Sequence, residues 1–538
     1  MRNLSIAGRK LILVSLLFLA VVDPHALNAA GVTLITHGYE SDTSFPTWVS
    51  AMADQIPGYF HRRFPGADTN LTRYRLTVTH SGSSYLFTST RTNGSAPFAG
   101  STGEIIIELD WTSLSGDLFD SYASTSNLAP AVAQVLMLTN AIAELNGHAL
   151  TEFPIHLIGH SRGGSLISQI SYVLGTNGIW VDHVTTLDPY PFNNDGNSDP
   201  VLYKDASAKN TFANVLFADN YWQDLGGGLL AGDPDGEPVS GAYVRQLTDL
   251  TGGYGSDHSN VHLWYHGTID FDAVASDGSA SIGSTERQTW WVPYEEEGVV
   301  AGFYYSLIGG ANRLSTDRPL GLATDPAIVD GYNQNWDLGA GTKANRTVLP
   351  SNSGTWPNII KFDVIGTNTV VAGNPISTKL YYQYGGASNL TARVYFDRDF
   401  NPYNSNGVQV LSLEPPATGT GSVSFYSNLG LPTTNIAPGV YAIYATISDG
   451  KHTRYLYAPE LAQITSNLPP ALEIAKSADT QFVITVNGIS GQMIELQSSF
   501  DLHAWLPLAT NTLTGSSWNY TNSTTNFSRR FYRAVLLP

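Results

Sequence analysis

Ile155-His156-Leu157-Ile158-Gly159-His160-Ser161-Arg162-Gly163 is the run from which the architecture of this chain is best inferred. Its first four residues predict a buried strand, and residues 165–174 place apolar side chains at helical spacing. Between them, two glycines flank a serine at the point where the chain must turn sharply. A hydroxyl in such a turn stands clear of its neighbours, as a nucleophile requires. Ser161 is therefore the candidate nucleophile.

An acid that supports this serine is expected at the end of a neighbouring strand. Residues 181–187 form a β-rich run that ends in Asp188-Pro189, where the proline prevents the strand from continuing. Ligands of open α/β sheets bind outside the carboxyl ends of the strands, so Asp188 is predicted on the same rim as Ser161. Asp219, which ends the run 215–218, is a rival for this role.

Three histidines offer a general base: His258, His262 and His266, where a glycine-bearing loop runs into a helical pattern. We favour His258 because it stands at the junction of loop and helix, and His262 is the alternative. Histidines four residues apart share one helix face, which also suggests a metal site. The zinc-protease motif needs a glutamate directly after its first histidine, and Ser259 stands there instead. No metal is therefore expected.

Together these motifs resemble those of the α/β-hydrolase superfamily, and most of all its pancreatic-lipase-type branch. The resemblance rests on four matches: His37-Gly38-Tyr39, Asp110-Trp111, Gly159-His160-Ser161 and Leu187-Asp188-Pro189. Members of that branch carry aromatic residues six and seven positions after the catalytic histidine, and Trp264 and Tyr265 stand there when counted from His258. The resemblance also implies Asp188 over Asp219 as the acid, although other members of the superfamily place it on the later strand. Animal members are disulfide-bonded, whereas this chain contains no cysteine.

The same resemblance implies an oxyanion hole and a fold class. The backbone N–H groups of Tyr39 and Arg162 would converge on the developing oxyanion. The fold class would be α/β: an α/β-hydrolase with a mostly parallel sheet, followed by all-β domains.

We expect four regions along the chain. Residues 1–30 form a signal peptide, and 31–345 an α/β-hydrolase catalytic domain with an extension from about residue 284. Short alternating runs between turn clusters in 355–465 predict an immunoglobulin-like β-sandwich. Residues 471–538 form a small C-terminal β module that resembles modules appended to secreted bacterial enzymes.

The N-terminal residues predict export. Arg2, Arg9 and Lys10 precede the apolar run 11–22, and the small residues Ala29-Ala30 follow, as in a secretory signal peptide. The mature chain would then begin near Gly31, in a secreted, extracellular or periplasmic protein of a bacterium. The apolar run has twelve residues, which is short of the roughly twenty that span a bilayer.

Composition limits the partners. The formal net charge of −18 argues against nucleic acid, which rewards clustered Lys and Arg. The expected partner is a small-molecule or lipid ester, and the C-terminal β modules could attach the protein to a cell surface or polymer. The sequence does not reveal the oligomeric state.

The function expected from these residues is a serine hydrolase of carboxylic esters, similar to a lipase or esterase. Ser161 would attack the acyl carbon, His258 would carry the proton, and Asp188 would orient the imidazole, with no cofactor. Two alternatives stay open: a small-peptide or amide hydrolase on the same fold, and a catalytically inert cell-surface binding protein.

Overall fold

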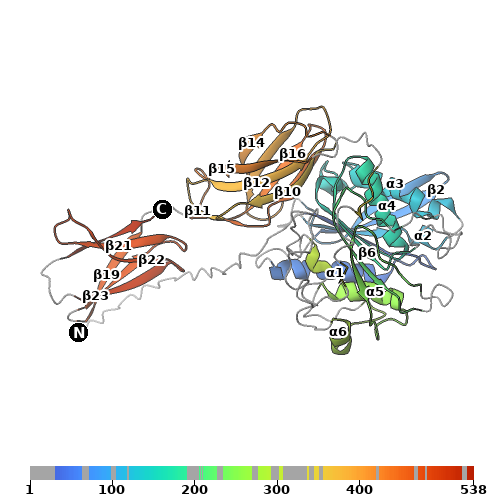
Figure 1. Cartoon of the computed structure of the whole chain (residues 1–538), viewed down its shortest axis with the longest axis horizontal. Helices are drawn as coiled ribbons and strands as arrows, with labels where there is room; N and C mark the ends of the chain where they lie inside the picture. The colour runs from blue at the N-terminus through green and yellow to red at the C-terminus, as the bar shows by residue number, and fades with distance from the viewer. Residues whose placement is uncertain are drawn as a thin grey trace, which may run out of the picture.

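The computed structural model describes most of the chain beyond residue 30. The described residues are 31–63, 72–97, 104–117, 120–190, 205, 208, 210–226, 234–269, 277–291, 302–306, 336–337, 345–349, 356–419, 423–465, 470–478, 481–523 and 530–537. The predicted signal peptide (1–30) lies outside them, as does most of the extension predicted from residue 284. Figure 1 shows three groups of elements in chain order: a large sheet with helices, a group of strands beside it, and a small C-terminal group of strands.

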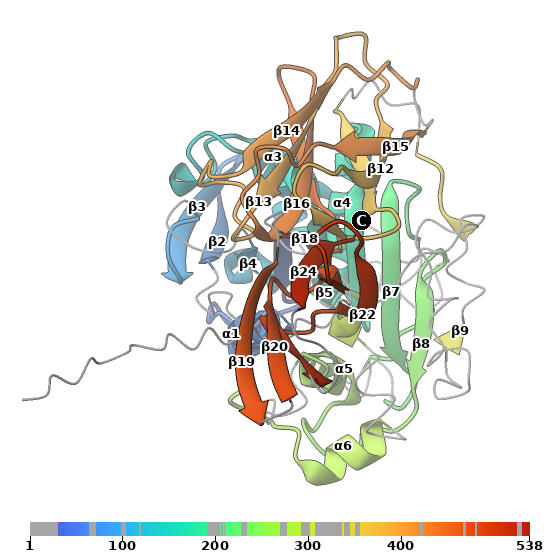
Figure 2. The same ribbon diagram turned by 90° about the vertical axis from the view of Figure 1, so that its left-hand side faces the viewer.

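The N-terminal group contains a nine-stranded sheet of order β3-β2-β4-β1-β5-β6-β7-β8-β9. At its centre, β1 (Val32–Thr36) pairs in parallel with both β4 (Ile105–Asp110) and β5 (Ile155–His160). The other strands are β2 (Thr72–Ser81), β3 (Ser84–Asn93), β6 (Val181–Leu187), β7 (Val215–Gln223), β8 (Tyr243–Leu247) and β9 (Trp336–Asp337). Antiparallel pairing occurs at the two edges, between β2 and β3 and between β8 and β9. Figure 2 shows β5, β7 and β8 in this sheet from the side.

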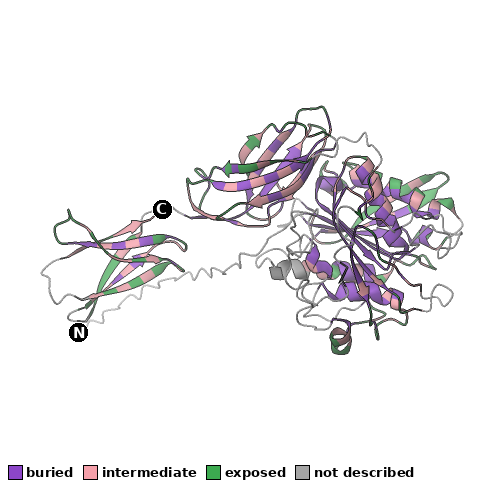
Figure 3. Cartoon of the chain, in the orientation of Figure 1, coloured by how far each residue is buried: buried purple, intermediate pink, exposed green. Residues whose placement is uncertain are grey.

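Helices cover both faces of this sheet. The helices are α1 (Thr47–Arg63), α2 (Thr112–Ser115), α3 (Thr125–Met137), α4 (Arg162–Thr176), α5 (Asp257–Gly267) and α6 (Ser284–Trp290). Apolar side chains of α3 and α4 share one core with Leu34 of β1, whereas those of α1 and α5 share a second core with Ile35. Successive residues of a strand point to opposite faces, so β1 contributes to both cores. Strands covered on both faces are buried along their length, as the purple central strands in Figure 3 show.

Two further sheets form a sandwich. One has the order β10-β12-β15, and the other has β11-β18-β16-β13-β14 with β17 paired to β16. The bounds are β10 (Asn358–Val364), β11 (Thr369–Val371), β12 (Ile376–Gln383), β13 (Thr391–Asp397), β14 (Val408–Leu413), β15 (Ser424–Leu431), β16 (Gly439–Ser448), β17 (Thr453–Tyr457) and β18 (Ala462–Thr465). Leu380 of β12 and Val394 of β13 belong to one buried core, so the two sheets pack face to face.

The last group consists of two three-stranded sheets, β19-β20-β23 and β22-β21-β24. Their strands are β19 (Ala471–Ala478), β20 (Gln481–Asn487), β21 (Met493–Ser499), β22 (Leu506–Thr512), β23 (Ser517–Ser523) and β24 (Phe531–Leu536). A small core that contains Ile484, Val486, Ile494 and Leu496 joins them.

The fold class predicted from the sequence is wrong. The chain is mostly β, with 42% strand and 20% helix, and its described strands form five sheets. An α/β-hydrolase assignment therefore does not describe this chain. The prediction failed because short motifs report the geometry of single turns, whereas the class depends on the whole chain, and strands dominate it. The carboxyl ends of parallel strands β5 and β6 in the first sheet carry the candidate site.

No helix in the described ranges combines the length and the apolar character that a bilayer crossing would need.

Candidate active site

Ser161 stands at the turn between β5 and α4. Its backbone has φ 55° and ψ −129°, a left-handed conformation that is strained for a residue with a side chain. This backbone conformation is stabilised by hydrogen bonds from Ser161 N to Leu187 O (3.0 Å) and from Tyr190 N to Ser161 O (3.0 Å). The tight turn that the sequence suggested is therefore present, and the strand that precedes Asp188 supports it.

Close backbone packing explains the glycines around Ser161. A Cβ atom at Gly38 would lie 2.5 Å from Ser161 Cβ, and one at Gly163 would lie 2.5 Å from His37 O. At Gly164 it would lie 2.6 Å from Pro189 Cβ. The serine turn can therefore pack against both the His37 loop and the Asp188 loop only because these positions have no side chain.

Asp188 and His258 are in contact. Asp188 follows β6 directly, and His258 is the second residue of α5. His258 Nδ1 lies 2.6 Å from Asp188 Oδ2, and both side chains are buried. Because Nδ1 donates to the carboxylate, the lone pair of the neutral ring is on Nε2. The structure thus brings the predicted acid and base together across 70 residues of sequence.

Gln223, which the sequence analysis missed, holds the carboxylate of Asp188. Its side-chain Nε2 donates to Oδ2 (2.9 Å) and its backbone N donates to Oδ1 (3.1 Å). Burial raises the pKa of Asp188, whereas the hydrogen bonds from His258 and Gln223 act in the opposite direction. Gly236 packs against Asp188 so closely that a Cβ atom there would overlap the carboxylate. No local signal marks Gln223, because its role depends on the pairing of β6 with β7.

The rival acid Asp219 belongs to a different network. Its Oδ1 accepts hydrogen bonds from His183 Nε2 (2.8 Å) and Thr185 Oγ1 (2.6 Å), and its Oδ2 accepts one from Tyr221 (2.9 Å). All these side chains lie on β6 and β7, inside the sheet layer. The contacts of Asp219 therefore favour Asp188 as the partner of His258.

The rival base His262 also has another partner. Its Nδ1 lies 3.2 Å from Asp277, which His266 Nδ1 contacts at 2.7 Å on the other oxygen. Burial lowers the pKa of His262, and its ring stacks on Trp48 with centroids 4.3 Å apart. Among the described residues no group of three His, Asp or Glu side chains is arranged to hold a metal ion.

His160 links the serine turn to the base. It directly precedes Ser161, and its Nε2 donates to the backbone carbonyl of His258 (2.8 Å). Burial, with the nearby charges of His258 and His262, lowers the pKa of His160 well below its usual range, so the ring is neutral. The end of β5 and the start of α5 are therefore joined by a direct hydrogen bond.

The His37-Gly38-Tyr39 loop lies against the serine turn. Burial lowers the pKa of His37 to about 4, so this ring is neutral near pH 7. Trp111 N donates to His37 Nε2 (3.3 Å), which leaves the proton on Nδ1 to donate to Gly38 O (3.0 Å). Trp111 also stacks on the ring of His37 with centroids 5.6 Å apart. Trp111, from the Asp110-Trp111 motif, thus has a structural role, because its contacts with His37 hold the loop that carries Tyr39.

The side chain of Arg162 serves the structure beneath the site. It forms a buried ion pair with Asp205, with Nε 2.6 Å from Oδ2, and donates to the carbonyl groups of Ser115 and Ala123. Its backbone N–H is at the first position of α4, where the helix dipole favours negative charge. A role in an oxyanion hole therefore belongs to its backbone and not to its guanidinium.

A cavity of about 640 Å³ opens over these groups. Its lining residues include Gly38, Tyr39, Glu40, Trp48, His160, Ser161, Arg162, Tyr190, Tyr254, His258 and His262. Tyr39 is exposed, and burial, with the charge of Asp42, raises the pKa of Glu40 to about 7. The predicted nucleophile, the predicted base and both oxyanion candidates thus face one space large enough for a small organic molecule.

Comparisons with known proteins do not identify a family. No family model matches the chain, and no curated protein does. A two-domain fibronectin type-III segment of chicken tenascin is 8% identical, with a TM-score of 0.16, over 33% of this chain and 98% of that one. A mutant of Salmonella alpha-2-macroglobulin is 12% identical (TM-score 0.13; 33% of this chain, 14% of that chain). The native E. coli alpha-2-macroglobulin is 11% identical (TM-score 0.13; 34% and 14%).

The α/β-hydrolase resemblance, with its pancreatic-lipase-type branch and the bacterial C-terminal module, is therefore wrong as an assignment. The chain is rich in sheet with only 20% helix, no α/β-hydrolase was found among its structural neighbours, and no family model supports the assignment. Motifs of two or three residues were shared because tight turns impose the same glycines on unrelated chains. The residues of the site therefore have to be judged on their own geometry.

Proposed function

We propose that the protein is a serine hydrolase that cleaves carboxylic esters through Ser161, His258 and Asp188. The observation that carries the proposal is the 2.6 Å contact between Asp188 and His258 at a cavity that Ser161 also lines. An imidazole held by a buried carboxylate, at the same cavity as a serine in a tight turn, is the arrangement that activates a hydroxyl.

The reaction would proceed through an acyl-enzyme. His258 Nε2 takes the proton of Ser161 as Oγ attacks the ester carbonyl, and Asp188 stabilises the imidazolium. The backbone N–H groups of Tyr39 and Arg162, two residues that line the same cavity, would stabilise the oxyanion. The alcohol leaves with the proton from His258, and water activated by the same ring then releases the acid.

The choice of an ester follows from the cavity and the proposed nucleophile. The expectation of a lipid ester depended on the resemblance that the comparisons overturn, so no acyl-chain length is preferred. Export, and surface attachment through the C-terminal strands, remain proposals that follow from the sequence of residues 1–30 and the modular layout.

The test is covalent labelling with a fluorophosphonate, together with hydrolysis of p-nitrophenyl esters of increasing chain length. The wild type is expected to label at Ser161, and Ser161→Ala to lose labelling and at least 10³-fold of kcat, roughly, since the nucleophile is gone. Ser259→Ala, also in the cavity wall, is the matched control and should keep both the labelling and the kcat of the wild type.

Two outcomes would point elsewhere. Absence of label on a folded wild type would favour the binding-protein alternative. Faster cleavage of aminoacyl amides than of esters would favour the peptidase alternative.

A further inference from the structure

Gly31 is buried and lies against the carboxyl group of Glu104. Its backbone N donates to Glu104 Oε2 at 2.7 Å, and the other carboxyl oxygen accepts a hydrogen bond from Thr33 Oγ1 at 2.9 Å. Glu104 is only 3% exposed. Two more hydrogen bonds fix the chain here, from Ile105 N to Gly31 O (3.0 Å) and from Val32 N to Pro154 O (2.8 Å). The position of the Gly31 nitrogen is therefore set by the first sheet itself.

The surroundings of Gly31 leave little room for a side chain. A Cβ atom at position 31 would lie 3.0 Å from Pro154 O and 3.2 Å from Glu104 Oε2. Both distances are tighter than ordinary van der Waals contact, so a larger residue would push the nitrogen away from the carboxylate. Glycine allows the close approach.

The carboxyl group of Glu104 accepts hydrogen bonds from two neutral donors, Gly31 N and Thr33 Oγ1. Burial raises the pKa of Glu104 to about 7, and the charge of Asp182 adds to this, whereas the bonds from Thr33 and Gly31 act against it. The charge of Glu104 also contributes to the raised pKa of the buried Tyr403. A positively charged donor at the same distance would stabilise the carboxylate about twice as strongly as a backbone amide does.

We propose that the chain is cut between Ala30 and Gly31, and that the new α-ammonium group of Gly31 forms a buried ion pair with Glu104. Water adds across the peptide bond under an endopeptidase supplied by the cell; Ala30 keeps a carboxylate, and the released amine of Gly31 takes up a proton. The pair anchors the start of β1, whose other end leads into the His37-Gly38-Tyr39 loop.

The test compares two proteins that both contain residues 31–538, one starting at Gly31 and one starting two residues earlier at Ala29. The Gly31 form is expected to melt about 5 °C higher, because removing one partner of a buried ion pair is strongly destabilising. Glu104→Gln should remove this difference, and Glu144→Gln, at a half-exposed acid paired with Arg91, should leave it intact. Equal Tm values for the two forms, or a difference that survives Glu104→Gln, would overturn the proposal.

The pH dependence gives a second, sign-specific outcome. In the longer form the pKa of Glu104 is raised. Its contribution to the free energy of unfolding is therefore fully present below pH 4.5 and is lost as the pH rises through about 7. In the Gly31 form the ammonium lowers that pKa, so the contribution persists above pH 4.5 and is lost on acidification. The difference in Tm should therefore widen from about pH 5 to about pH 7, below the pKa of about 7.7 to 8.0 of an unfolded α-amino group, and a difference that narrows over this range would contradict the ion pair.

The mass of the exported protein completes the experiment. Its N-terminal residue should be Gly31, and any other start would overturn the proposal. None of these measurements depends on esterase activity, so failure here leaves the proposed function untouched, and the reverse also holds.

Discussion

Close backbone contacts constrain the residues of the turn at Ser161. Ser161 is held in a left-handed backbone conformation while Gly38 touches its Cβ position, and a neutral His37 holds the loop that carries Gly38. A shift of one ångström between reacting groups can cost about 10²-fold in rate. The geometry of the turn is thus the sensitive quantity at this scale.

Gly38→Ala tests that sensitivity. The added Cβ atom would stand 2.5 Å from Ser161 Cβ and 2.9 Å from His160 O, so either the turn or the loop must move. We expect kcat/KM for a p-nitrophenyl ester to fall at least about 100-fold. Gly255→Ala is the control, because a Cβ atom there meets nothing within 4 Å. Equal activity of the two variants would contradict the role given to the loop.

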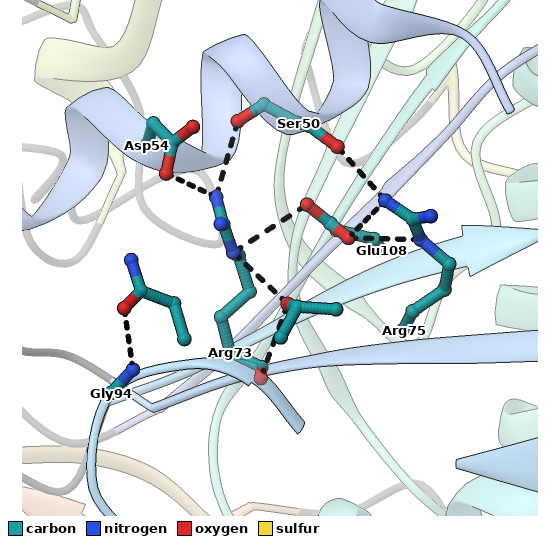
Figure 4. A network of polar contacts seen from close by, with 8 residues as sticks. Ser50, Asp54, Arg73, Arg75, Gly94 and Glu108 are labelled. Atoms are coloured by element: carbon teal, nitrogen blue, oxygen red, sulfur yellow. Dashed lines mark hydrogen bonds and ion pairs between the residues drawn. The ribbon is translucent and has the colours of Figure 1, made fainter. Parts of the chain in front are cut away.

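At the scale of elements, a charged cluster joins β2 and β4 of the first sheet to α1. Glu108 of β4 is fully buried and lies between Arg73 and Arg75 of β2, and Arg75 Nη2 reaches Ser50 Oγ of α1 at 3.1 Å (Figure 4). Glu108 Oε2 is 3.1 Å from Arg75 Nη2, whereas Glu108 Oε1 is 3.6 Å from Arg73 Nε. One buried carboxylate therefore lies next to two arginines of the neighbouring strand, and Asp54 of α1 also pairs with Arg73 at 2.5 Å.

Removing that carboxylate should destabilise the fold without affecting the chemistry. We expect Glu108→Gln to lower the free energy of unfolding in urea by about 2 kcal/mol, below the usual cost for a buried pair because Arg75 is partly exposed. The rate of Ser161 labelling should not change. Arg91→Gln, in the half-exposed pair with Glu144, should cost less than about 1 kcal/mol. A similar loss in both variants would show that burial is not the deciding factor.

At the scale of the whole molecule, the sandwich packs against the first group of elements. Phe153 follows a short turn of that group. The centroid of its ring lies 4.4 Å from that of Tyr403 and 4.9 Å from that of Tyr455, both in the sandwich. Asn358 adds hydrogen bonds to Gly178 O (2.8 Å) and from Trp180 N (3.0 Å). The two groups share buried surface and should unfold together.

Phe153→Ala should uncouple them. Removing a buried aromatic ring lowers the free energy of unfolding by about 3 to 5 kcal/mol. The ring of Phe153 lies at the contact between the two groups, so its removal weakens that contact. Calorimetry is expected to show one main transition in the wild type that splits into two in the variant. Tyr381→Ala, on the partly exposed face of β12, should leave a single transition. A variant that shifts in Tm without splitting would indicate that other contacts suffice for coupling.

The sequence alone determined local features of this protein: the strands at 32–36 and 181–187, the glycine-flanked turn at Ser161, and the helix start beside His258. The family and the fold class that it predicted are wrong. Catalysis by Ser161, Asp188 and His258 stays a prediction.

Only the tertiary structure decided which of the candidates meet. It paired His258 with Asp188, gave Asp219 to His183 and Asp277 to His262 and His266, and introduced Gln223 and His160 as supports. Spacing along the chain carries information about turns and periodicity over a few residues. Contacts between residues tens of positions apart depend on which strands pair and how helices pack on them, and that is fixed only when the whole core forms.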